Sequence, residues 1–385
     1  MYVPTTHRRY RSEPIPLSVG SPAWAARTSP APRHIAATPI QAKPTPTDAG
    51  YREHVRFDDV DALVVMSFGG PESMAEVMPF LRHVVAGRDV PDERLAAVAE
   101  QYHAFNGVSP LNGHNRDLVS RLREQAPRQW RGQKVYLANR NSHPFPQDSF
   151  AMMAEAGVQT VAAFITSAFS SYSGCRQYRQ NLTVGADYAG IDVKVLPRFY
   201  DHPILRDIWV DRVVAAQPGP GTRVVFVTHS LPVAQARGVV PGITGYLAQH
   251  EALAAEIAKR AGDRMAQPLD WTLAFQSRSG PPHQPWLEPD ISPAIEAAAD
   301  DGVSRVVVAP IGFCADNLEI RWDLDTVAAA TAADRGIEMQ RLDPPQSDGR
   351  FTDLVWDLFA VGDGFSCQVG CCPDPHGGGP AVGER

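Results

Sequence analysis

Short apolar runs recur along the chain, and each one stops at a turn or at polar residues. Eight of these runs are rich in Val, Ile, Leu, Phe and Ala, and we predict that they form strands buried on both faces. They cover residues 61–68, 134–139, 160–166, 192–197, 223–228, 271–276, 305–311 and 337–342. The stretches between them are amphipathic or Ala-rich, as in 92–105 and 250–266, and we expect helices there.

Strands that alternate with helices are typical of α/β folds with parallel sheets. The eight runs fall into two sets of four, so the sequence predicts two similar domains, at residues 56–205 and 206–345. We expect the remaining segment, 346–385, to begin with a helix at 351–362 and to continue as a tail rich in Gly, Pro and Cys.

Residues 1–55 differ in composition from the rest of the chain. The first 50 contain nine prolines and six Lys or Arg, but only two acids, Glu13 and Asp48. We interpret this segment as a disordered Pro/Arg-rich extension. An organelle transit peptide is the alternative, although the prolines argue against the amphipathic helix that such peptides form.

The formal net charge of −7 argues against nucleic acid as a partner. No apolar run reaches the about 18 residues of a transmembrane segment, and no signal peptide is visible. The five cysteines include a cluster of three in "GFSCQVGCCPD", which in a chain of this length favours metal binding over a disulfide framework. We therefore expect a cytoplasmic protein, and we expect it to be a monomer.

Polar and aromatic residues gather where the predicted strands end. Open parallel sheets bind ligands beyond the carboxyl ends of their strands. His229 follows the fifth strand and Glu319 follows the seventh, so we expect these two side chains to meet. A His–carboxylate pair can transfer protons or hold a divalent metal, and Asp323, one turn on, would extend the row of acids. The alternatives are a turn histidine that bonds to the backbone and an acid that favours a helix N-terminus.

Several motifs at these strand ends occur in an order that resembles the ferrochelatase family, from about residue 60 to 360. They are "SFGGPES", "GVSPLN", "ANRNSHP", "SAFSSYSGCRQYRQN", "HSLP", "QSRSGPPHQPWLEPDI" and "GFCADNLEIRWDLD". The resemblance implies two Rossmann-like domains around a porphyrin cleft, and insertion of Fe²⁺ into a porphyrin during haem synthesis.

The resemblance also implies residue roles. His229 and Glu319 would bind Fe²⁺ and accept protons. The resemblance does not assign which of the two is the base and which is the metal ligand. Ser109 and Tyr172 would bind the porphyrin propionates, with a helix cap and a packed aromatic ring as the respective alternatives. Similar actinobacterial chains use coproporphyrin III, so we expect Fe-coproporphyrin III (coproheme) as product. The alternatives are protoporphyrin IX, another divalent metal, and a non-catalytic porphyrin- or cluster-binding sensor.

Three positions depart from the family pattern. Asn317 stands where many relatives have His, so a proton role there is lost. Val327 replaces a third acid, and Phe68 stands where some relatives have a Tyr that can ligate iron. We expect metal delivery and axial coordination to differ here.

The cysteine pattern resembles that of actinobacterial ferrochelatases whose four cysteines ligate a [2Fe–2S] cluster. The corresponding residues are Cys175, Cys367, Cys371 and Cys372. Thiolates suit zinc equally well, so zinc and unligated thiols are the alternatives. We interpret Cys314 as a small buried core residue.

Overall fold

The computed structural model describes most of the chain from residue 59 to 360, together with short pieces on either side. The described ranges are 52–53, 59–88, 90–126, 134–236, 244–280, 283–360, 364–365, 371–372, 374–375, 379 and 381–383. All of them belong to one compact unit, Asp48–Arg385. The predicted extension, 1–55, lies outside the described residues apart from 52–53.

The N-terminal half contains a parallel four-stranded sheet in the order β3-β2-β4-β5. Its strands are β2 (Ala62–Ser67), β3 (Val135–Asn139), β4 (Thr160–Ile165) and β5 (Asp192–Val195). Every residue of β2 is buried, because helices cover both faces of this central strand. The helices are α1 (Met74–Val84), α2 (Asp92–His103), α3 (Leu111–Gln125), α4 (Pro146–Glu155) and α5 (Gln177–Ala189), with a π-helical turn at Tyr172–Arg176.

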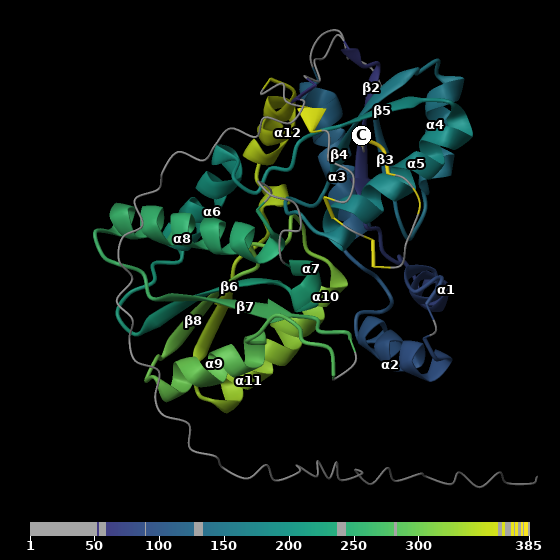
Figure 1. Ribbon diagram of the computed structural model, residues 1–385. Coiled ribbons are helices and arrows are strands. Elements are labelled where there is room, and N and C mark those ends of the chain that lie inside the picture. The colour runs from purple at the N-terminus through teal and green to yellow at the C-terminus, as the bar shows by residue number, and fades with distance from the viewer. Residues whose placement is uncertain are drawn as a thin grey trace, which may run out of the picture. The chain divides into compact units, whose positions relative to one another are not determined.

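The C-terminal half contains a second parallel sheet in the order β7-β6-β8-β9 (Figure 1). Its strands are β6 (Thr222–His229), β7 (Trp271–Gln276), β8 (Arg305–Ala309) and β9 (Glu338–Arg341). The helices are α6 (Pro203–Ala215), α7 (Val233–Ala236), α8 (Tyr246–Met265), α9 (Ile291–Asp300), α10 (Leu318–Trp322), α11 (Ala329–Asp334) and α12 (Arg350–Ala360). A π-helical segment, Asp323–Ala328, joins α10 to α11, and a 3₁₀ turn, Pro345–Ser347, precedes α12.

The two sheets share one strand order: in each, the first strand in sequence lies between the second and the third. The second strand is therefore added on one side of the first strand, and the third and fourth strands are added on the other side. The gap between the carboxyl ends of the first and third strands is the place where such sheets bind ligands. In the second sheet these strands are β6 and β8.

The prediction of two four-stranded parallel sheets flanked by helices is confirmed, and all eight strands lie within the predicted runs or within one residue of them. Two short antiparallel strands, β1 (Arg52–Glu53) and β10 (Gly364–Phe365), were not predicted, nor were the π-helical turns. The domain boundaries at 205 and 345 stay a prediction.

Candidate active site

His229 is the last residue of β6 and still pairs with Gln276 of β7. Its ring nitrogen Nδ1 lies 2.5 Å from the backbone oxygen of Ser230. A carbonyl oxygen can only accept a hydrogen bond, so Nδ1 carries the proton in the neutral ring. Nε2 then keeps its lone pair and is free to act as a base or a ligand. The sequence also allowed a histidine that only bonds to the backbone of a turn. Nδ1 makes such a bond, but Nε2 does not take part in it.

Glu319 stands in the first turn of α10, which follows β8. Asn317 caps this short helix, because its Oδ1 accepts the backbone N–H of Ile320 at 2.9 Å. The expectation that Asn317 has no proton role stays a prediction, but the residue has a structural role: it orients the turn that carries Glu319.

The side chains of His229 and Glu319 meet, with Nε2 3.9 Å from Oε2. This distance is too long for a direct hydrogen bond, which spans about 2.7–3.2 Å. When the imidazole is neutral, both atoms carry lone pairs that repel each other. A proton on one of the atoms, or a cation between them, removes this repulsion. First-row divalent zinc sits about 2.0–2.2 Å from such nitrogen and oxygen ligands, so one ion of that size can contact both atoms. The side chains are 30% and 44% exposed, which leaves the pair open to solutes.

Asp323 lies one turn beyond Glu319, at the start of the π-helical segment. Burial is the main cause that raises the pKa of its carboxyl to about 6, and the negative charge of Glu319 contributes in the same direction. The hydroxyl of Ser277 donates a hydrogen bond to Asp323, which works in the opposite direction, and Gln276 Nε2 lies 3.4 Å from the same oxygen. The row of acids expected from the sequence is therefore present, with one member that titrates near neutrality.

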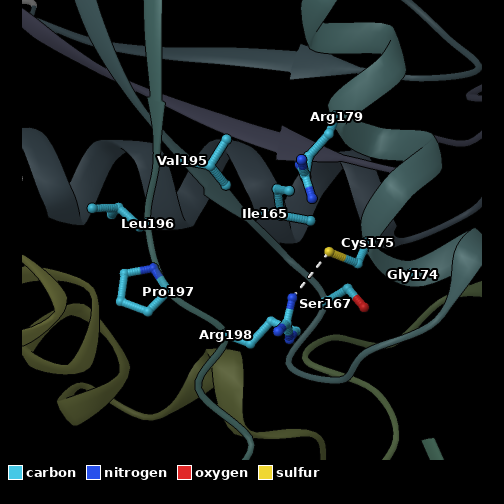
Figure 2. A pocket seen from close by; sticks show the side chains of 9 residues that line it. All are labelled: Ile165, Ser167, Gly174, Cys175, Arg179, Val195, Leu196, Pro197 and Arg198. Atoms are coloured by element: carbon cyan, nitrogen blue, oxygen red, sulfur yellow. Dashed lines mark hydrogen bonds between the residues drawn. The ribbon is translucent and has the colours of Figure 1, made fainter. Parts of the chain in front are cut away.

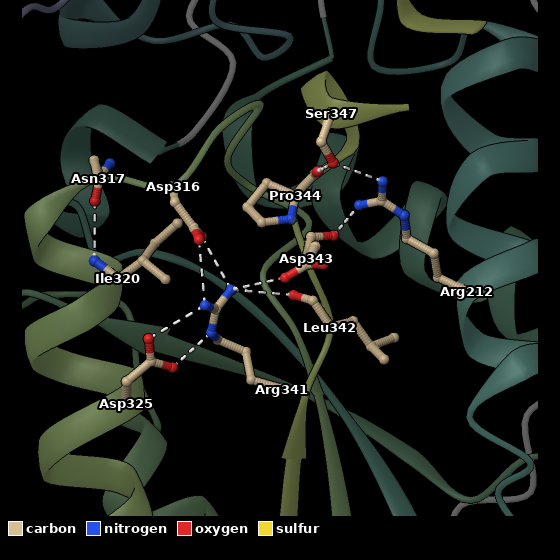
Figure 3. A network of polar contacts seen from close by, with 10 residues as sticks. All are labelled: Arg212, Asp316, Asn317, Ile320, Asp325, Arg341, Leu342, Asp343, Pro344 and Ser347. Atoms are coloured by element: carbon tan, nitrogen blue, oxygen red, sulfur yellow. Dashed lines mark hydrogen bonds and ion pairs between the residues drawn. The ribbon is translucent and has the colours of Figure 1, made fainter. Parts of the chain in front are cut away.

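Arg341, the last residue of β9, holds the segment around Glu319 at both ends (Figure 3). Its Nη1 lies 2.9 Å from Asp316 Oδ1, and its Nε lies 2.6 Å from Asp325 Oδ1. The Arg341 and Asp316 side chains are only 15% and 14% exposed, so solvent screens this pair less than a surface ion pair. We name Arg341, Asp316 and Asp325 the arginine clamp.

A buried hydrogen-bond chain lies behind His229. The one phenol proton of Tyr246 is shared between the backbone oxygen of His229 at 3.0 Å and Thr228 Oγ1 at 2.6 Å. Thr228 Oγ1 lies 2.9 Å from Nε2 of His250, whose Nδ1 faces the backbone oxygen of Tyr246. Burial lowers the pKa of His250 to about 3, so this ring is neutral and accepts the threonine hydroxyl proton. Phe169 stacks on it, with ring centroids 3.5 Å apart.

The two predicted porphyrin residues lie in the N-terminal half. Ser109 is 5% exposed and packs against Gly70, where a side chain would come within 2.7 Å of Ser109 Oγ. Tyr172 is 9% exposed, and its hydroxyl bonds to the carboxylate of Asp374. Burial raises the pKa of Tyr172, and Asp374 raises it further. Their roles in porphyrin binding stay predictions.

Three of the four predicted cluster cysteines come together, although their sequence positions are far apart. Cys371 and Cys372 have sulfur atoms 3.9 Å apart, and the pKa of Cys372 is raised because its thiol also contacts Cys175. Cys367 lies outside the described residues. Among the described residues, no group of three or more His, Cys, Asp or Glu side chains is arranged for metal binding. The thiols are therefore neighbours without a formed coordination geometry.

Cys314 behaves differently from these thiols. It is 8% exposed and packs in the main hydrophobic core, and burial raises its pKa to about 12. The prediction of a small buried core residue is confirmed.

A small cavity of about 20 Å³ opens beside Cys175 (Figure 2). Arg179 and Arg198 line it together with Cys175, and Nη1 of Arg198 donates to the Cys175 sulfur at 3.2 Å. We name this space the thiol cavity. It is slightly larger than the about 10–15 Å³ that one water needs. The porphyrin cleft predicted between the two halves stays a prediction.

Sequence reasoning missed the arginine clamp and the chain behind His229. A usable signal existed for both. Arg341 is the next-to-last residue of a predicted strand, at the edge where the ligand site was expected. Tyr246 and His250 are four residues apart, which puts them on one face of a helix.

No helix among the described residues combines the length and the apolar character needed to cross a membrane. The family model for ferrochelatase matches residues 60–361. The coproporphyrin III ferrochelatase of Mycobacterium ulcerans is 44% identical over 305 residues, which cover 78% of this chain and 86% of that relative. The coproporphyrin III ferrochelatase of Frankia alni is 44% identical over 314 residues, with coverages of 78% and 79%.

Among solved structures, SirB from Bacillus subtilis aligns with a TM-score of 0.46 and 12% identity, over 79% of this chain and 99% of that chain. A likeness this weak adds nothing to the strand order described above. The match to the family model and the identity to these relatives cover most of the described sequence. The chain therefore belongs to the ferrochelatase family.

Proposed function

We propose that this protein is an enzyme that inserts Fe²⁺ into coproporphyrin III and gives Fe-coproporphyrin III in haem biosynthesis. The observation that carries the proposal is the 3.9 Å gap between His229 Nε2 and Glu319 Oε2 at the ligand-binding edge of a ferrochelatase-family sheet. The choice of coproporphyrin III is supported by the relatives from Mycobacterium ulcerans and Frankia alni, which carry that substrate in their names.

The overall reaction has a simple proton balance. Two pyrrole N–H bonds break, two protons leave, and the four ring nitrogens bind one Fe²⁺, with no change in the oxidation state of iron. An enzyme for this reaction needs a proton acceptor at the ring centre and a group that attracts the cation. His229 and Glu319 provide both within one gap.

We assign proton acceptance to His229, because its Nδ1–H is held by the Ser230 oxygen and its Nε2 lone pair is therefore available. The imidazolium that forms is stabilised by the carboxylate of Glu319. Glu319 then serves as the oxygen ligand that brings in Fe²⁺, and carboxylate oxygen suits this divalent substrate. Asp323, whose pKa lies near 6, takes protons onward from the pair.

On the porphyrin side we propose that Ser109 and Tyr172 bind propionate groups. Both can donate an O–H to a carboxylate, as Tyr172 does to Asp374. A porphyrin propionate would then replace Asp374 as the acceptor. Coproporphyrin III has four propionates, so it depends on such donors more than protoporphyrin IX does.

We further propose that Cys175, Cys367, Cys371 and Cys372 hold a [2Fe–2S] cluster. Three of these thiols are neighbours, and Arg198 donates to one of them. Thiolate is the ligand that such clusters require. A bound cluster would supply a cross-link between the loop at Cys175 and the C-terminal segment, and no step of metal insertion needs its redox chemistry.

A direct test is anaerobic incubation of the full-length protein with Fe²⁺ and each porphyrin in parallel. We expect the free-base spectrum of coproporphyrin III to disappear at a rate proportional to enzyme concentration. We expect kcat/KM for protoporphyrin IX to be at least about tenfold lower than kcat/KM for coproporphyrin III. Equal or faster reaction of protoporphyrin IX would overturn the substrate assignment. Porphyrin binding without metallation of either substrate would identify a sensor instead, and turnover only with Co²⁺ or Ni²⁺ would identify another chelatase.

A further inference from the structure

Helix α8 of the C-terminal half contacts the loop that leads from β4 to Tyr172 in the N-terminal half. The contact is made by Gln249, which is 2% exposed, and by Ser170 of the loop, which is 5% exposed. Gln249 Oε1 accepts the backbone N–H of Ser170 at 2.7 Å, and Gln249 Nε2 donates to Ser170 Oγ, also at 2.7 Å. The same Nε2 donates to the backbone oxygen of Thr244 at 2.8 Å. The oxygen and the nitrogen of this buried amide therefore both have partners.

The hydrogen bonds between Gln249 and Ser170 fix the position of the loop. A backbone N–H can bond only to an acceptor, so the oxygen of the amide has to face Ser170. Any sliding of the loop along α8 would leave buried polar groups without partners, which is unfavourable. An apolar contact would tolerate such movement, because the hydrophobic effect has no preferred direction. Gln249 thus defines where the loop lies, in addition to holding it against α8.

The position of the loop determines the position of Tyr172. Ser171 is the N-cap of the π-helical turn Tyr172–Arg176, and its Oγ accepts the backbone N–H of Gly174 at 2.8 Å. Tyr172 is the first residue of this turn and lies two positions after Ser170. Its backbone is therefore set between a residue anchored to α8 and a capped turn.

The same turn of α8 holds the backbone of the candidate base. Tyr246 lies three positions before Gln249, and its phenol lies 3.0 Å from the backbone oxygen of His229. Residues three apart in a helix are neighbours on its surface. One helical turn therefore contacts both the strand end that carries His229 and the loop that carries Tyr172.

We propose that Gln249 is a positioning residue for porphyrin binding, which holds the Tyr172 phenol where it can bind a propionate, in a fixed place relative to His229. This inference rests on the proposed role of Tyr172 in binding the porphyrin. A phenol that is already in place loses little conformational freedom when the propionate binds, so less of the binding energy is spent on ordering the loop. Gln249 acts through Ser170, since its own amide is buried.

The experiment measures the Kd of coproporphyrin III by fluorescence quenching, and kcat and KM by anaerobic kinetics, on full-length protein. Gln249→Met removes the amide and keeps the length of the side chain. Ser170→Ala removes the Oγ partner and keeps the backbone bond. Each variant is also combined with Tyr172→Phe. Gln267→Met is the matched control, because Gln267 follows α8 and its amide donates to the backbone oxygen of Pro218 within the C-terminal half.

We expect Gln249→Met to raise both the Kd and the KM for coproporphyrin III about tenfold. Its kcat should stay within about twofold of wild type, because Tyr246 still holds His229. Ser170→Ala should raise the Kd by a smaller factor, about threefold, since the backbone bond remains. When Tyr172→Phe is present, Gln249→Met should change the Kd by less than about twofold, because the phenol that it positions is absent. Gln267→Met should match its parent protein in both backgrounds.

Equal effects of Gln249→Met on the Kd with and without the Tyr172 phenol would overturn the inference, since the amide would then support the fold in general. A loss of kcat at an unchanged Kd would overturn it as well, because Gln249 would then act on His229. Urea unfolding identifies variants that do not fold, and if Gln249→Met is one of them, Ser170→Ala with and without the phenol decides between the same outcomes.

The failure of the proposed function has a different signature. Tyr172→Phe that binds coproporphyrin III like wild type would overturn the assignment of Tyr172, and the positioning role of Gln249 with it. Wild-type protein that binds this porphyrin without metallating it would overturn the proposed reaction. The Kd values would still decide the role of Gln249 in that case, because they need no turnover.

Discussion

Arg341 and Asp316 form an ion pair at 2.9 Å that joins the end of β9 to the residue three positions before Glu319. Asp325 binds the same guanidinium six positions after Glu319. The carboxylate that faces His229 therefore stands on a segment fixed at both ends.

We expect Arg341→Met to lower kcat with little change in the KM for porphyrin. Release of the segment displaces Glu319, and a displacement of about 1 Å at a reacting group costs up to about 10²-fold in rate. Steady-state kinetics under anaerobic conditions measures both constants. Arg335→Met is the matched control, since Arg335 pairs with Asp300 near the protein surface. Unchanged kcat in Arg341→Met would show that the clamp does not position Glu319.

Asp323 predicts a pH effect on insertion. Its carboxyl has a pKa of about 6, mainly because it is buried, so it is neutral in acid and anionic above that pH. We expect the ratio of the wild-type rate to the Asp323→Asn rate to be close to one below about pH 5 and to rise through about pH 6. Asp353→Asn, on the exposed side of α12, serves as control. A ratio that stays constant with pH would remove Asp323 from proton transfer.

His250 predicts how stability depends on pH. Its pKa is about 3 in the folded protein and near 6.5 when the chain is unfolded, because burial disfavours the charged ring. Between these values the unfolded state binds more protons, so the free energy of unfolding falls as pH falls, by up to about 1.4 kcal/mol per pH unit.

The variant His250→Gln isolates this effect, since glutamine can accept from Thr228 but does not titrate. Asp323 acts in the opposite direction, because its folded pKa is raised, and it acts equally in both proteins. Urea unfolding at a series of pH values should therefore show that wild type loses more stability than His250→Gln from about pH 6.5 to 4.5. Parallel curves would mean that His250 is accessible to protons in the folded state.

Ser109 and Tyr172 lead to a prediction about binding. If they hold propionates, Ser109→Ala and Tyr172→Phe raise the KM for coproporphyrin III several-fold and leave kcat nearly unchanged, because the contact is equal in ground and transition states. The expected effect on protoporphyrin IX is smaller, since it has fewer propionates. Equal loss of kcat at saturating porphyrin would contradict this placement.

The sequence was sufficient for the features that depend on periodicity. Buried parallel strands are continuous apolar runs, so all eight were predicted, and the strand ends located His229 and Glu319 in one region. The π-helical segment at Asp323 was not predictable, because one extra residue in a turn leaves little trace in an apolar pattern.

Long-range polar contacts escaped prediction for a different reason. Arg341 and Asp316 are twenty-five positions apart, and nothing local shows that an arginine at the end of a strand will reach a particular carboxylate. The same applies to Arg179, whose buried charge is visible only once α5 is packed against the C-terminal segment. Asn317 was noted as a departure from the family pattern, and its function as a helix cap required the geometry of α10.

The central claim is that His229 and Glu319 together exchange two protons for one Fe²⁺. The most direct test is the anaerobic rate of coproporphyrin III metallation by His229→Ala and Glu319→Gln, with porphyrin affinity measured on the same samples by fluorescence quenching. The account predicts that each variant loses about 10²–10⁴-fold in rate and binds porphyrin like wild type. Metallation at the wild-type rate by either variant would contradict it.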